Sequence, residues 1–202
     1  WILFIPLFFT FGFRIYPGNM RWDISTSAPK LWLRFCQTPQ IGTNDLPEED
    51  TLYNQSLDFN GAISSIINDY NSVSWSYLRL ADARIDSDYA AQGNQRTIDI
   101  CFEPPGGLAG GLAQPVFEGH QIIGCHIKIG LTVLGSAKAF VAAVTHEIGH
   151  CVGFDHPQET TQAIMSYYAQ GIYRLQMDDK MGLTYLYPTS PANGVEESTM
   201  GL

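Results

Sequence analysis

The stretch from His146 to His156 reads HEIGHCVGFDH and constrains the fold more than any other part of the chain. In an α-helix, residues four apart lie about 40° apart around the axis and about one turn along it, so His146 and His150 face the same point. Glu147 is displaced around the axis, which places its carboxylate beside that point. Gly153 suits the left-handed residue that ends a helix, and a chain that turns back there brings His156 to the same place.

This arrangement predicts a metal site. Three imidazole ligands leave one coordination position of a zinc ion open, which is typical of catalytic rather than structural zinc. We therefore predict that His146, His150 and His156 bind one zinc ion and that Glu147 is a catalytic general base. A single histidine would by default be a satisfied core or surface residue, but chance does not also place Glu147 and Gly153.

The same residues match the extended zinc signature H-E-x-x-H-x-x-G-x-x-H of the metzincin peptidases. Ala163-Ile164-Met165-Ser166-Tyr167 follows where that clan carries a methionine in a tight turn beneath the metal. The chain resembles the clan over about 170 residues, from Arg21 to Pro188. The turn and His156-Pro157 resemble the bacterial serralysins, whereas the compact length resembles a matrixin catalytic domain. The segment 175–187 is similar to the closing helix of both families. We therefore identify the chain as a matrixin-like or minimal serralysin-like metzincin of bacterial type.

The resemblance implies an α/β (α+β) fold. The expected architecture is a twisted, mostly parallel five-stranded sheet with an active-site helix, a second long helix and a small C-terminal lobe. The resemblance also implies that Tyr167 is catalytic, because serralysins and astacins keep a tyrosine two residues after the methionine. Asp155 is the rival third ligand, since some metzincins use aspartate there, but His156 has the spacing that the signature requires.

The implied function is that of a zinc-dependent endopeptidase acting on protein or peptide substrates bound in an extended form. By resemblance, residues 111–114 form an antiparallel edge strand over the active site, where a substrate can pair through main-chain hydrogen bonds. The alternative function is an exported zinc-binding module with an adhesive or structural role and no peptidase activity. The intact Glu147 and the open coordination position argue against that alternative.

Hydrophobic periodicity places the remaining elements. Alternation predicts strands over residues 30–36, 77–83, 97–102 and 122–129. Apolar residues at helical spacing predict an amphipathic core helix of about four turns that starts near Asp58. Ser136 is the expected cap of the active-site helix. Gly149 is unfavourable inside a helix, which predicts a close neighbour there, the Met165 turn.

Composition narrows the partners. The net charge is -9, and the 11 basic residues form no dense cluster, so nucleic acid is excluded as a partner. The chain of 202 residues is long enough for one catalytic domain, which we place at residues 21–188, and we expect a monomer. Residues 189–202 read as a flexible tail.

Two further features indicate export. Residues 1–20 form an apolar N-terminal segment that we interpret as the remnant of a signal peptide. The alternatives are a membrane anchor over residues 1–13, a buried strand or the remnant of a prosegment. The four cysteines form an even set that suits two disulfides in a secreted or extracytoplasmic protein, and three pairings are possible. Four buried thiols are the other interpretation.

A second metal site is not predicted from the remaining candidates. His120 and His126 lack the H-x-D pattern of a structural zinc site, so we interpret them as surface or packed histidines. Asp82, Asp86 and Asp88 allow a calcium ion, but they miss the EF-hand spacing and also fit a solvated face. The glycine-rich loop 104–111 lacks the lysine and the spacing of a phosphate-binding loop.

Overall fold

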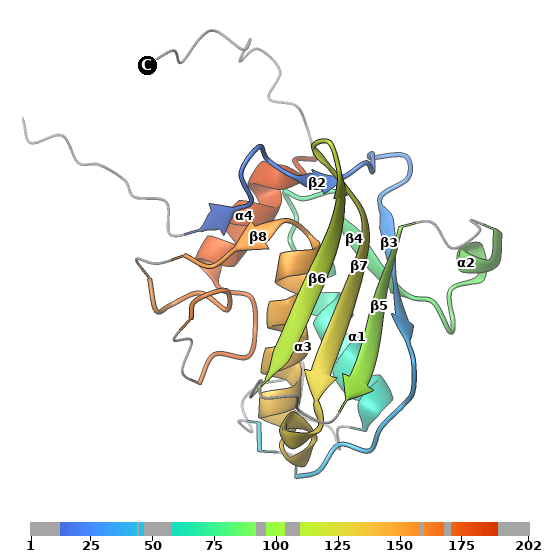
Figure 1. Cartoon of the computed structure of the whole chain (residues 1–202), viewed down its shortest axis with the longest axis vertical. Coiled ribbons are helices and arrows are strands. Elements are labelled where there is room, and N and C mark those ends of the chain that lie inside the picture. The colour runs from blue at the N-terminus through green and yellow to red at the C-terminus, as the bar shows by residue number, and fades with distance from the viewer. Residues whose placement is uncertain are drawn as a thin grey trace, which may run out of the picture.

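A twisted sheet with two helices packed against one face forms the centre of the computed structural model (Figure 1). The structure describes residues 13–43, 45–46, 58–91, 96–103, 110–157, 160–167 and 171–189. The strands are β1 (Arg14–Ile15), β2 (Arg21–Trp22), β3 (Lys30–Phe35), β4 (Arg79–Asp82), β5 (Thr97–Glu103), β6 (Gly111–Glu118), β7 (Gln121–Gly130) and β8 (Phe154–Asp155). The helices are α1 (Phe59–Asn71), α2 (Ser87–Ala91), α3 (Ala137–Cys151) and α4 (Met177–Leu186), with a short 3-10 helix η1 (Leu131–Gly135).

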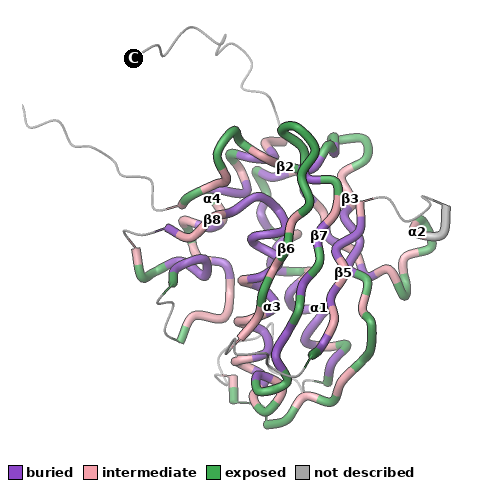
Figure 2. Tube along the Cα trace, in the orientation of Figure 1, coloured by how far each residue is buried: buried purple, intermediate pink, exposed green. Residues whose placement is uncertain are grey.

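The main sheet confirms the predicted α/β architecture. Its strand order is β2-β7-β5-β3-β4, and all neighbours in that order whose pairing is assigned are parallel. Strand β6 pairs antiparallel with β7 along its whole length. Five strands therefore span the sheet as expected, and the two-residue β2 adds a sixth that the periodicity did not predict. Figure 2 shows the sheet's edge at β6 as largely exposed, while α3 behind it is mostly buried.

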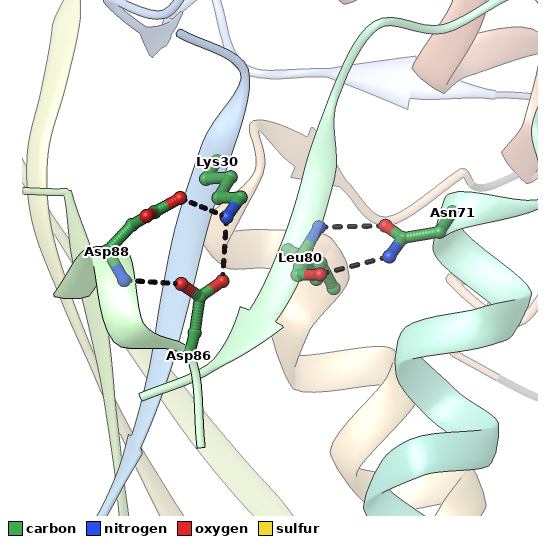
Figure 3. Close-up of polar contacts among 5 residues, drawn as sticks. All are labelled: Lys30, Asn71, Leu80, Asp86 and Asp88. Carbon is green, nitrogen blue, oxygen red and sulfur yellow. Dashed lines mark hydrogen bonds and ion pairs between the residues drawn. The ribbon is translucent and has the colours of Figure 1, made fainter. Parts of the chain in front are cut away.

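Helix α1 forms where the apolar spacing predicts it. Its N-cap is Asp58, whose side chain accepts a hydrogen bond of 2.8 Å from the backbone N–H of Gly61. At the other end, the side chain of Asn71 bonds both the N–H and the carbonyl of Leu80, at 2.8 and 2.9 Å, which ties α1 to β4 (Figure 3). The helix therefore has a defined start and a fixed attachment to the sheet.

Helix α3 carries His146 and His150, and it has a defined start, a buried inner face and a defined end. Ser136 caps it as predicted, accepting a 3.0 Å hydrogen bond from the N–H of Ala139. Its inner face is fully buried through Phe140, Val141, Val144 and Ile148. Each such side chain contributes about 1.5–3 kcal/mol to folding. Gly153 has a φ of +114° where the chain leaves the helix, as the sequence predicted.

Two disulfides choose among the three pairings that the sequence left open. Cys36 is bonded to Cys101, which joins the end of β3 to β5. Cys125 is bonded to Cys151, which fixes the last residue of α3 to β7, and both of these cysteines are buried. The interpretation of four buried thiols is therefore wrong. The second disulfide holds the histidine-bearing end of α3 against the sheet.

Short elements account for the differences from the sequence expectation. Residues 77–83 form a strand only over Arg79–Asp82. Helix α2 and the two-residue strands β1, β2 and β8 were not predicted, because segments this short carry no measurable periodicity. Residues 1–12, 104–109 and 190–202, on which the predicted export signal, glycine-rich loop and tail largely fall, lie outside the described residues. The boundaries of the catalytic domain stay a prediction.

Among the helices of the described ranges, none has both the length and the apolar character needed to cross a bilayer.

Candidate metal centre

Three imidazole rings converge at the end of α3. The Nε2 atom of His156 lies 3.0 Å from Nε2 of His146 and 3.2 Å from Nε2 of His150. His146 and His150 come from α3, one turn apart, and His156 returns from the turn that follows Gly153. In the part of the chain that the structure describes, this is the one group of three or more metal-ligating side chains that meets at a point.

Backbone carbonyls fix the orientation of two of the rings. Nδ1 of His146 lies 2.7 Å from the carbonyl oxygen of Ile164, and Nδ1 of His150 lies 2.9 Å from that of Phe154. A carbonyl only accepts hydrogen bonds, so each Nδ1 must carry the proton and donate it. Each Nε2 then presents a lone pair to the centre of the cluster when the ring is neutral.

The electrostatics of the cluster favour neutral rings. Burial lowers the pKa of His146 and of His156 from the usual value. Burial and the neighbouring His146 lower the pKa of His150 to about 4. All three rings are therefore uncharged at neutral pH, which is the form that binds a metal.

These distances fit a zinc ion. Two nitrogens bound tetrahedrally to one zinc at about 2.05 Å lie about 3.3 Å apart. The observed separations of 3.0 and 3.2 Å are close to that value. Neutral His146 and His150 carry their proton on Nδ1, so among the three Nε2 atoms only that of His156 can carry a proton. One N–H group cannot satisfy both facing lone pairs well, whereas a cation can bind all three nitrogens.

Glu147 lies beside the cluster under the sheet's edge. Its side chain is buried, and the backbone N–H of Ala113 on β6 donates a hydrogen bond to it. Burial raises the pKa of Glu147 to about 7, and the Ala113 N–H partly opposes that rise. A Cβ at Gly111 would overlap the Glu147 carboxylate, so a glycine is needed where β6 crosses it. The edge strand predicted at residues 111–114 exists and extends to Glu118.

Tyr167 stacks on the third histidine. The ring centroids of Tyr167 and His156 are 3.9 Å apart with an interplanar angle of 28°, and Tyr167 is 62% exposed. The ring of Tyr167 therefore lies against one member of the histidine cluster and is largely exposed to solvent.

Met165 fills the space under α3. It is buried in a turn closed by a 3.1 Å hydrogen bond from the Ser166 N–H to the Ala163 carbonyl. A Cβ on Gly149 would overlap the Met165 sulfur. The close neighbour that the sequence predicted for Gly149 is therefore confirmed.

This contact gives a stability prediction. We expect Gly149→Ala to lower the free energy of unfolding by about 1–3 kcal/mol, because the methyl group overpacks a filled site. Gly124→Ala is the matched control, since a Cβ there meets only Val116 at 3.9 Å. The control should stay within about 0.5 kcal/mol of the wild type in urea unfolding. Equal stability of the two variants would refute the contact.

Asp179 is a supporting residue that sequence reasoning missed. Its buried carboxylate accepts hydrogen bonds from the N–H groups of Ile164, Met165 and Gln176, at 2.9, 3.4 and 2.8 Å. The carbonyl of Ile164 in turn holds His146. Asp179 therefore links the start of α4 to His146, a candidate metal ligand. The one available signal was an acidic residue at the third position of a predicted helix, where capping boxes occur.

Sequence reasoning also missed the contact between the N-terminal residues of the described chain and the histidine cluster's turn. Strand β1 pairs antiparallel with β8, and Arg14 forms a 3.0 Å ion pair with Asp155. Asp155 also accepts a 2.8 Å hydrogen bond from the backbone N–H of His156. The Asp155 side chain, the alternative third ligand of the sequence analysis, therefore supports the turn that carries His156. Burial, followed by Asp155 and Glu147, raises the pKa of the nearby Tyr16 to about 12, so its hydroxyl is protonated at neutral pH.

The possible calcium residues have cationic partners within the chain. Lys30 Nζ lies 2.9 Å from Asp86 and 2.6 Å from Asp88 (Figure 3). Asp82 pairs with Arg84 at 2.6 Å. Each of these carboxylates already faces a cationic side chain, and calcium binding stays a prediction.

His126, which we interpreted as a surface or packed histidine, lies on the exposed side of β7, 3.4 Å from Asp99.

An apolar groove of about 570 Å³ lies elsewhere on the surface. Its lining includes Trp75, Met177, Met181 and Tyr185, and no histidine, cysteine or carboxylate contributes to it. The groove therefore lacks the groups that activate water or hold a catalytic ion.

One of three comparisons with known proteins bears on this region of the chain. A family model described as matrixin, from a group of peptidases, matches residues 43–188. A comparison with curated proteins found no significant match. Among solved structures, "GM1 bound form of the ECX AB5 holotoxin" is similar at 10% identity and a TM-score of 0.49, covering 87% of this chain and 92% of that chain. The matched family span contains all three histidines, Glu147 and Tyr167.

Proposed function

We propose that this chain, which belongs to the matrixin family of peptidases, is a zinc-dependent endopeptidase that cleaves protein substrates. The observation that carries the proposal is the meeting of the Nε2 atoms of three imidazole rings at one point. The buried Glu147 directly follows one of these histidines on α3. A zinc ion held by His146, His150 and His156 would lower the pKa of a bound water to about 7 and polarise the scissile carbonyl.

The substrate is expected to bind along β6. One edge of β6 pairs with β7, and no described strand pairs with the other edge. An extended peptide can add to that free edge through main-chain hydrogen bonds. Because Gly111 and Ala113 lie against Glu147, a peptide on this edge passes its carbonyl close to the carboxylate.

Glu147 is the proposed general base. A carboxyl group whose pKa is near 7 takes up and releases a proton readily at neutral pH. Glu147 would accept a proton from the attacking water and deliver it to the amine that leaves. The contact of Glu147 with β6, the strand proposed to hold the peptide, supports this role.

Tyr167 is the proposed partner of the oxyanion. In this proposal the hydroxyl of Tyr167 donates a hydrogen bond to the substrate oxygen as negative charge develops there. Met165 would support the ligands from below without contacting the substrate.

The expected export of the protein is supported by its two disulfides, because disulfides form in oxidising compartments.

The role of Tyr167 can be tested by removing only its hydroxyl. We expect Tyr167→Phe to lower kcat roughly 100-fold with little change in KM, because the lost hydrogen bond is strongest in the transition state. Tyr185→Phe, on an exposed tyrosine of α4, is the control and should keep wild-type kcat. An unchanged kcat in Tyr167→Phe would remove the residue from the mechanism.

The activity itself is tested with a generic protein substrate such as casein. We expect cleavage by the zinc-loaded protein, loss of cleavage with a chelator, and recovery when zinc is restored. Zinc binding without any cleavage would instead support the alternative function, a zinc-binding module that is not a peptidase. Cleavage that a chelator leaves unchanged would contradict the metal's role.

A further inference from the structure

Tyr16 comes to the metal centre from outside the part of the chain that the family model matches. That model begins at residue 43. The pairing of β1 with β8 carries Tyr16 there, and its backbone N–H donates a 3.0 Å hydrogen bond to the carbonyl of Gly153. Figure 1 shows the N-terminal strand, in blue, beside β8 at the top of α3. The family match therefore says nothing about the role of Tyr16.

The ring of Tyr16 stands between β6 and a metal ligand. Its centroid lies 5.5 Å from that of Phe117, in an edge-on arrangement of 79°, and 6.4 Å from the ring of His150. Tyr16 is half-buried and Phe117 is 39% exposed. The two rings form a corner, the Tyr16–Phe117 corner, whose outer surfaces remain open to a bound molecule.

Phe117 faces the same side of β6 as the residues that touch Glu147. Gly111, Ala113 and Phe117 share one face, because they pair with the buried Ile129, Ile127 and Ile122 of β7. Val116 pairs with Gly124 and points to the other face. Residue 117 also follows the register shift between β6 and β7, a kind of irregularity that re-aims side chains next to active sites. From Ala113 to Phe117 is four residues of strand, or about 13 Å.

We propose that the Tyr16–Phe117 corner is a substrate subsite for an apolar or aromatic side chain. This proposal rests on the proposed peptidase function and adds to it a preference in the substrate. Strand β6 runs away from Glu147 toward Phe117, so an antiparallel peptide places the residues that precede its cleaved bond along this stretch. At about 3.3 Å per residue, the corner meets the side chain two to four residues before that bond.

The chemistry of the corner selects the side chain. Two aromatic rings in edge-on contact offer apolar faces against which a further ring or a branched aliphatic chain packs. The nearby charged groups that act on the Tyr16 hydroxyl are the carboxylates of Asp155 and Glu147. An acidic substrate side chain is therefore disfavoured at this position, and Phe or Leu is favoured over Ser and Asp.

The test compares otherwise identical peptides that carry Phe or Ser two, three or four residues before the cleaved bond. We expect the wild-type protein to prefer Phe at one of these positions by roughly 10-fold or more in kcat/KM. Tyr16→Ala and Phe117→Ala should bring that ratio close to one. Tyr16→Phe should keep it, because the ring and not the hydroxyl forms the corner.

Val116→Ala is the matched control, since Val116 neighbours Phe117 but points to the other face of β6. It should keep the wild-type ratio. A purely structural effect of Tyr16→Ala on His150 would lower kcat/KM for both peptides alike and leave their ratio intact, which would overturn the subsite. A wild-type ratio near one at all three positions would overturn it as well. Failure of the zinc-loaded wild-type protein to cleave any peptide would instead overturn the proposed peptidase function.

Discussion

Glu147→Gln should retain its zinc and lose peptide cleavage by about 100- to 10,000-fold in kcat, the range that general acid–base catalysis contributes. The amide has nearly the same shape as the carboxylate, and it can still accept the hydrogen bond from the Ala113 N–H. It cannot take a proton from water at any accessible pH. The measurement is kcat on a peptide substrate together with the zinc content of each preparation.

A surface carboxylate provides the control for this change. Glu103 on β5 is half-exposed and pairs with Lys128 at 3.1 Å, away from the histidines. Glu103→Gln should keep both zinc and turnover. If Glu147→Gln retained wild-type kcat, the general base would have to be another group. If it lost its zinc, the carboxylate would be needed for metal binding, and the loss of activity would carry no information about proton transfer.

His156→Ala should lose zinc. The remaining His146 and His150 supply only two ligands, and their Nε2 atoms would face a gap where the third nitrogen stood, 3.0 and 3.2 Å away. Removal of a partner that only orients a ligand costs 10- to 100-fold in metal affinity, so removal of a ligand should cost more than about 100-fold. The affinity is measured by competition with a chromogenic chelator.

Two variants separate His156 from its neighbours. Asp155→Asn removes the charge that pairs with Arg14 but keeps His156, so it should weaken zinc binding by no more than about 100-fold. His126→Ala removes an exposed histidine of β7 and should leave the affinity unchanged. Stoichiometric, tight zinc in His156→Ala together with zinc loss in Asp155→Asn would make Asp155 the third ligand.

Much of the fold follows from local patterns in the sequence. The alternation over residues 30–36 and the helical spacing after Asp58 are long enough for periodicity to register, and both elements form where they were expected. Ser136 and Gly153 mark the two ends of α3 through their cap and turn chemistry. The convergence of the three histidines follows from helical geometry plus one turn, so it too could be predicted from spacing.

Other parts of the site depend on contacts between residues that are far apart in the chain. Asp179 holds residues 164 and 165, and Tyr16 reaches the carbonyl of Gly153. Nothing in the local sequence around Tyr16 or Asp179 specifies those partners. The disulfide pairing was open for the same reason, because four cysteines allow three connectivities until the strand order is known. Long-range register is a property of the assembled sheet, and short segments do not encode it.

The claim on which the account depends is that three imidazole nitrogens hold one zinc ion and leave one position to solvent. X-ray absorption at the zinc edge of the purified protein tests it most directly. We predict one zinc per chain with three histidine nitrogens and one non-protein oxygen, all at about 2.0–2.2 Å. A first shell containing sulfur, a shell filled by four protein ligands, or protein that binds no zinc would contradict the account.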